Sequence, residues 1–209
     1  FENANRGIAV GAYGAFYETR DGGRTWTGRK FEYRPLPRPR KPASADEFFA
    51  DQPPDYHLNK IAGIGSRLYI AAEAGNLFRS DDGGATWRQL PSPYNGSFYG
   101  VLPLTPDDVL VFGLRGRLFR SGDGGATWQA IPTGTEAMLT DGYRDTDGTL
   151  VIVGLAGTVL VSRDGGTSWI AQQQADRKGL AAVVAAGDGH IVVVGEGGVK
   201  RLSLHGTSN

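Results

Sequence analysis

Four aspartates of this chain lie in nearly identical eight-residue segments, which we call phrases. In each phrase two glycines follow the aspartate, which is Asp21, Asp82, Asp123 or Asp164. Turns that combine aspartate with glycine are a familiar ligand set for Ca²⁺, which prefers oxygen ligands. Each phrase offers only one or two carboxylates, however, and none has the EF-hand spacing with its terminal glutamate. We therefore expect no metal site at these aspartates and assign them a structural role.

The structural alternative is a hairpin clasp. In each phrase the aspartate can accept backbone N–H bonds across the turn, the glycines permit positive φ, and the hydroxyl two residues earlier can bond the same turn. A tryptophan ends each phrase, and we expect its ring to be buried between neighbouring sheets. The predicted structural residues are Asp21, Trp26, Asp82, Trp87, Asp123, Trp128, Asp164 and Trp169.

Two further carboxylates, Glu73 and Glu196, occupy matching turns and could form an acid–base pair. A glycosidase needs two carboxyls roughly 5–10 Å apart, but these two belong to units that are not neighbours in the sequence. Solvated turn residues are the favoured interpretation. The three histidines, His57, His190 and His205, show no spacing typical of metal ligands. We predict no catalytic residue, no cofactor and no metal.

The repeat itself predicts the fold. The last three tryptophans are 41 residues apart, and the first gap is 61, which is one repeat plus an insertion. A period of ~40 residues with short strands and glycine turns is typical of propeller blades. We expect an all-β propeller of four-stranded antiparallel blades, about five of them, in one body over residues 1–209. The innermost strands are expected at 58–64, 97–104, 138–143 and 179–186. Residues 1–7 supply at most a short strand, and the last unit ends after its third strand.

The composition of the chain narrows the classes of function that it can have. The 22 basic and 22 acidic side chains balance, which gives no general attraction to nucleic acid or anionic lipid. Cysteine is absent, and no apolar run approaches the ~20 residues that span a bilayer. We expect no nucleic-acid partner and no membrane insertion. The chain begins at Phe1 and its one methionine is Met138, so we expect that an N-terminal portion has been removed.

The phrase Ser-x-Asp-x-Gly-x-Thr-Trp is the Asp-box, or bacterial neuraminidase repeat, and the chain resembles Asp-box propellers over its whole length. Val-Gly-x-x-Gly before the boxes, together with Ala9–Gly14 before Thr19–Trp26, is similar to the photosystem II stability/assembly factor family. That resemblance implies a seven-bladed, non-enzymatic propeller, exported to a lumen or periplasm, that binds a membrane-protein partner. The chain would then be part of such a ring.

A Pro-rich, charged insertion at 29–57 interrupts the repeat. Its first half is basic and its second half acidic, with a capping box at Ser44–Glu47 that predicts a short helix. The insertion is either a functional excursion or a variable loop. In a propeller, the turns between second and third strands share one face with the connections between blades, so we expect the insertion to lie on that face. The predicted partner-binding residues are Tyr13, Arg34, Arg38, Arg40 and Arg115.

These observations favour a scaffold or assembly factor that binds a membrane-associated protein outside the cytoplasm. Two alternatives stay open: a sialidase-like glycoside hydrolase and a carbohydrate-binding propeller. A sialidase would need an arginine triad and usually carries an Arg-Ile-Pro motif, which this sequence lacks. All four tryptophans lie in boxes, so none is left as an obvious platform for stacking sugars.

Overall fold

The computed structural model describes residues 1–37, 56–187 and 189–204. In these residues the chain forms five antiparallel sheets, which we number as blades 1 to 5 in chain order. Blade 1 holds β1 (Gly7–Val10), β2 (Phe16–Thr19) and β3 (Thr27–Gly28). Blade 2 holds β4 (Leu58–Ile64), β5 (Arg67–Ala72), β6 (Leu77–Ser80) and β7 (Arg88–Gln89). The prediction of an all-β propeller is confirmed.

The remaining blades follow the same order. Blade 3 holds β8 (Phe98–Pro103), β9 (Val109–Gly113), β10 (Leu118–Ser121) and β11 (Gln129–Ile131). Blade 4 holds β12 (Leu139–Arg144), β13 (Leu150–Gly154), β14 (Thr158–Ser162) and β15 (Ile170–Gln173). Blade 5 holds β16 (Leu180–Gly187), β17 (His190–Gly195) and β18 (Gly198–Ser203). The only helical elements of the described residues are two single 3₁₀ turns, η1 (Ala12–Gly14) and η3 (Leu114–Gly116).

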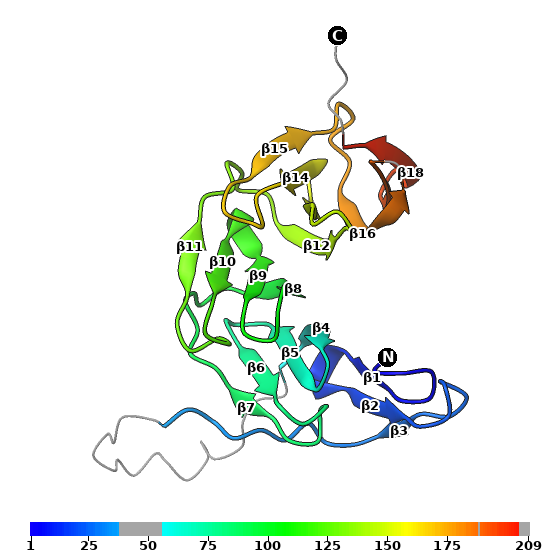
Figure 1. The fold of residues 1–209 in the computed structure, drawn as a ribbon, viewed down its shortest axis with the longest axis vertical. Helices are drawn as coiled ribbons and strands as arrows, with labels where there is room; N and C mark the ends of the chain where they lie inside the picture. Colours follow the sequence, from blue (N-terminus) through cyan, green and yellow to red (C-terminus); the bar gives the residue numbers. More distant parts are fainter. Residues whose placement is uncertain (38–55, 188, 205–209) are drawn as a thin grey trace.

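The blades stand side by side in an open arc (Figure 1), with blade 1 at one end and blade 5 at the other. Their first strands line the concave side: β4, β8, β12 and β16 contact one another in that order. We call the four strands of a blade A to D from this inner side outward. Blade 1 lacks strand A in the described residues, because residues 2–6 form a turn that leads directly into β1. In the described residues, blade 5 comprises strands A to C.

The B strands of blades 2, 3 and 4 are buried on both faces because alternate residues point into different interfaces. In β5, Tyr69 belongs to the cluster shared with blade 3, whereas Ile70 belongs to the cluster shared with blade 1. In β13, Val151 faces blade 5 and Ile152 faces blade 3. One apolar cluster therefore fills each of the four interfaces between consecutive blades, which fixes the blades to one another.

Bulges near the start of the inner strands of blades 2 and 4 add a second link between blades. The register of strand A shifts at Asn59 in blade 2 and at Thr140 in blade 4. The Asn59 amide nitrogen donates to Phe98 O at 2.8 Å, and the Thr140 hydroxyl donates to Leu180 O at 2.7 Å. The bulged residue thus turns out of its own ladder and bonds the next blade.

Candidate functional site

The Asp-boxes form nearly identical hydrogen-bonded turns. In blade 2, the Ser80 hydroxyl donates to Asp82 Oδ1 at 2.7 Å and accepts the N–H of Gly84 at 2.8 Å. Asp82 also accepts the N–H and the hydroxyl of Thr86, at 2.9 and 2.6 Å. Blades 1, 3 and 4 repeat these bonds around Asp21, Asp123 and Asp164. This is the geometry of a clasp that joins strands C and D.

These bonds favour the ionised carboxylate. The hydroxyl of Thr86, followed by its N–H, lowers the pKa of Asp82 to about 2, and Thr25 has the same effect on the pKa of Asp21, also to about 2. Thr127 and Ser168 hold the pKa values of Asp123 and Asp164 well below the usual range. In the described residues, no group of three or more His, Cys, Asp or Glu side chains is arranged to hold a metal ion.

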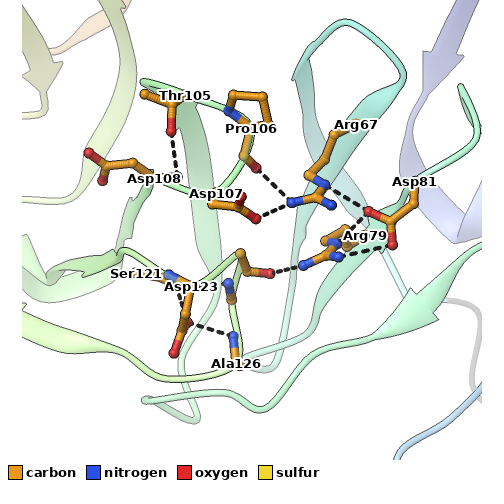
Figure 2. A network of polar contacts seen from close by, with 12 residues as sticks. Arg67, Arg79, Asp81, Thr105, Pro106, Asp107, Asp108, Ser121, Asp123 and Ala126 are labelled. Carbon is orange, nitrogen blue, oxygen red and sulfur yellow. Dashed lines mark hydrogen bonds and ion pairs between the residues drawn. The ribbon is translucent and has the colours of Figure 1, made fainter.

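Arginines link the boxes of blades 2 and 3 to their surroundings, and Figure 2 shows those between the two blades. Arg79 Nη1 donates to Gly124 O of the next box at 2.8 Å, and its other two nitrogens donate to the carboxylate of Asp81. Arg67 bonds Asp81 at 2.7 Å and also pairs with Asp107 of blade 3. Partial burial alone would raise the pKa of Asp81, but Arg79 and Arg67 together lower it. The face that carries the boxes is therefore crosslinked by structural ion pairs.

The tryptophans differ more than the repeat predicts. Trp87 is buried, with 4% of its surface exposed, and its indole N–H donates to Gly84 O at 3.0 Å. Trp128 and Trp169 are half-buried. Trp26 is 39% exposed and contacts the ring of Phe1 at 5.9 Å. The expectation that every ring is buried between sheets is wrong for Trp26, because no described sheet packs against blade 1 on that side.

The two carboxylates considered for acid–base chemistry serve the backbone instead. Glu73 accepts the N–H of His57 at 2.8 Å, and Glu196 accepts the N–H of Gly179 at 2.9 Å. Each bond ties a B–C turn to the residue that leads into strand A of the same blade. Since the two glutamates make the same bond in blades 2 and 5, they are equivalent members of a repeat rather than two halves of one site.

The face opposite the boxes is formed by the B–C turns and the connections that precede strand A. We call it the B–C face and define it by the turn residues Tyr13, Ala74, Arg115, Ala156 and Gly197. Backbone bonds confirm that turns and connections meet there, such as Leu114 N to Ser97 O at 3.1 Å. The predicted sharing of one face by these segments is confirmed.

Four tips of this face have left-handed backbone. The φ angles are 54° at Tyr13, 53° at Ala74, 55° at Arg115 and 54° at Ala156. Glycine suits this region best, but Gly197, at the matching position of blade 5, does not have a positive φ. Tyr13 is 77% exposed and its ring contacts His57 edge-on at 4.6 Å; Arg115 is also exposed. Tyr13 and Arg115 are separated by the turn of blade 2, so the structure places them on one face without bringing them into contact.

A hollow of about 600 Å³ lies beside Arg115 on blade 3. Its walls include Arg115, Arg117, Phe119, Pro132 and Glu136. This hollow was not predicted from the sequence, although the close spacing of Arg115 and Arg117 could have indicated a basic site there. The hollow combines two guanidinium groups with apolar wall, which suits an acidic, partly apolar segment of a protein.

Arg34 does not lie on the B–C face. Its N–H donates to Trp87 O at 2.8 Å and its carbonyl accepts the N–H of Gln89 at 2.9 Å, so it runs along the outer edge of blade 2. Figure 1 shows this part of the chain passing beside β7. The expected position of Arg34 beside Tyr13 is therefore wrong. Arg38, Arg40, His205 and the helix expected after Ser44 lie outside the described residues.

The start of the insertion is part of the core. Phe31 contacts the rings of Phe16, Phe78 and Trp87 at 5.6, 5.0 and 5.8 Å. Arg29 lies over the Phe16 ring at 4.4 Å and donates to Gly84 O at 2.6 Å. These residues fill the interface between blades 1 and 2, so the basic first half of the insertion is only partly a free surface.

Repeated four-stranded blades, clasped by Asp-boxes and arranged around a common inner side, define an Asp-box β-propeller. The chain belongs to the family described as photosynthesis system II assembly factor YCF48, whose model matches residues 1–208. A search of curated proteins finds no match.

Solved structures agree with this fold. A structure titled "YCF48 bound to D1 peptide" is 23% identical, with a TM-score of 0.71, and covers 96% of this chain and 60% of its own. YCF48 from Cyanidioschyzon merolae is 21% identical, with a TM-score of 0.68, and covers 95% of this chain and 63% of its own. The Niastella koreensis GH74 enzyme is 18% identical, with a TM-score of 0.65, over 92% of this chain and 32% of its own. The chain thus spans less than two thirds of the YCF48 structures that it matches.

Proposed function

We propose that this chain is a non-enzymatic assembly factor that binds an extended segment of a membrane-associated protein through its B–C face. Family membership over residues 1–208 supports this role. A similar protein is described as bound to a D1 peptide, which supports a peptide-like ligand. The resemblance also favours a place outside the cytoplasm, on the lumenal or periplasmic side of a membrane. No helix of the described residues is long and apolar enough to cross a membrane.

The observation that carries the proposal is the backbone of the B–C tips. A non-glycine residue in the left-handed region costs about 1–2 kcal/mol. Tyr13 and Arg115 accept that cost at exposed positions where glycine would fold more easily. Backbone of this kind clusters at functional sites, and at these two tips it carries a large side chain, whereas the matching tips of blades 2 and 4 carry Ala74 and Ala156. The hollow beside Arg115 supplies a cavity for a partner side chain. The guanidinium groups of Arg115 and Arg117 would complement the charge of an acidic partner.

Binding to a D1 peptide tests the proposal. Arg115→Glu is expected to weaken binding roughly tenfold, mainly by slowing association, because exposed charges steer encounter. Binding by the wild-type chain should weaken as salt rises. Arg24→Glu is the matched control, since Arg24 is exposed on the box side of blade 1. An equal loss with Arg24→Glu, or an unchanged affinity with Arg115→Glu, would contradict the assignment of the face.

The absence of catalysis is a separate part of the proposal. Its support is the use of Glu73 and Glu196 as acceptors for backbone N–H groups. A panel of fluorogenic glycosides tests it, and no turnover is expected. Turnover that disappears in Glu73→Gln or Glu196→Gln would establish a glycosidase instead.

A further inference from the structure

The outer edge of blade 2 carries an additional extended segment of the chain itself. Arg34 pairs in parallel beside Arg88 of β7. Its N–H and carbonyl both bond the edge, through Trp87 O and Gln89 N. Leu36 N–H then reaches the Gln89 side chain at 3.2 Å. The fold therefore accepts an extended segment as a fifth, parallel strand of a blade.

Strand β15 presents the same edge in blade 4. Ile170 and Ala171 stand two repeats after Arg88 and Gln89 in the sequence. Gln174 N–H bonds inward, to Gly157 O at 2.8 Å, so the alternating pattern turns the peptide groups of Ala171 and Gln173 outward. Among the described residues, no backbone hydrogen bond reaches the outward N–H of Ala171 or Gln173.

This edge lacks the features that usually block strand addition. The third outward position is Pro91 in blade 2 and Pro132 in blade 3, but Gln173 in blade 4 keeps its N–H. Strand β15 has four residues and no charge, whereas β7 has two residues and β11 three. Ile170 is 65% exposed. Proteins ordinarily protect free edges with proline, charge or a covering segment, and β15 has none of the three in the described part of the chain.

We propose that the outer edge of β15 binds an extended protein segment as an additional parallel strand, in the way that β7 holds the residues around Arg34. The central residue of the segment would donate to Trp169 O and accept from Ala171 N. It would lie beside Ile170, where a β-branched or aromatic side chain pairs better than the arginine seen beside Arg88. The next residue can be proline, as Pro35 is after Arg34. This surface is at the outer rim of blade 4 and involves neither Tyr13 nor Arg115, so it goes beyond the proposed function.

The probe is a synthetic peptide with the sequence of residues 32–37 and valine in place of Arg34, blocked at both ends. Titrated into the isotope-labelled full chain, it should shift the amide signals of Ala171 and Gln173 in a saturable way. The same peptide with proline at the central position cannot donate to Trp169 O and should bind roughly tenfold more weakly, the factor that the loss of one hydrogen bond gives.

Ala171→Pro is the test on the protein side. Proline is tolerated in an edge strand where the N–H points outward, so the fold should persist while the affinity for the peptide falls roughly tenfold. Ala130→Pro, at the matching position of β11, is the control and should leave binding unchanged. Should Ala171→Pro lower the melting temperature, Ile170→Lys serves instead: it keeps the backbone edge and should weaken the valine peptide several-fold.

Three results would overturn the proposal. One is a titration in which the peptide binds saturably but shifts amide signals away from β15, or in which it shifts no amide signals. Another is equal affinity in wild type and in both β15 variants. The third is a concentration-dependent dimer that Ala171→Pro abolishes and the peptide does not displace, because the edge would then belong to a second copy of the chain.

Discussion

The ammonium group of Lys60 lies 2.7 Å from Asp141 Oδ1, although the two residues belong to the inner strands of blades 2 and 4. Blade 3 stands between them and contributes Gly100 at the matching position of its own inner strand. Asp141 is buried, and its second oxygen accepts the N–H of Val183 in blade 5 at 3.1 Å. The Asp141 carboxylate thus joins blades 2, 4 and 5 across the concave side of the arc, through one ion pair and one hydrogen bond.

We expect Lys60→Met to lower the free energy of unfolding by about 1–2 kcal/mol. The value lies between those of exposed and buried pairs, because Lys60 is partly exposed and Asp141 is not. Chemical denaturation measures it. A double-mutant cycle with Asp141→Asn isolates the pair, and additive single losses would show that the pair itself contributes nothing.

The blades could be predicted from the sequence because the signals that define them are local. The 41-residue period and the alternation of apolar residues place strands such as β4 and β12 correctly to within one residue. The Lys60–Asp141 pair could not be found this way, since it depends on the curvature that brings inner strands together. The position of Arg34 was missed for a related reason: the stem of the insertion carries Phe31, whose burial draws the chain between blades 1 and 2 rather than over the B–C face.

The box serine should matter more for stability than the box aspartate. Ser80→Ala leaves the buried N–H of Gly84 without its acceptor, which costs about 1–3 kcal/mol. Asp82→Ala releases groups of Thr86 that are exposed and can bond water, so the expected loss is about 1 kcal/mol or less. Thermal unfolding of the two variants compares them directly. A larger loss for Asp82→Ala would mean that the carboxylate does more than close the turn.

Acid should weaken the clasps together. The folded-state pKa values of Asp21 and Asp82 are lowered to about 2, from an ordinary value of 3.8. The unfolded chain therefore binds more protons in this range, and the stability contributed by the boxes is present above about pH 4 and lost as the pH falls toward 2. Melting temperatures measured from pH 6 to pH 2 test this. In Asp82→Asn the decline should be shallower than in wild type, and an identical decline would contradict the role of that carboxylate.

Two tryptophans of the same repeat should respond differently to truncation. Trp87→Ala removes a buried ring that packs on Phe16 and Phe31, and is expected to cost about 3–5 kcal/mol. Trp26→Ala removes a ring that is already 39% exposed and rests mainly on Phe1, so the expected cost is about 1 kcal/mol. Urea denaturation of the two variants measures both values. If Trp26→Ala were as damaging as Trp87→Ala, the outer face of blade 1 would have to be covered in solution, and the protection of Trp26 from a fluorescence quencher would show that cover independently.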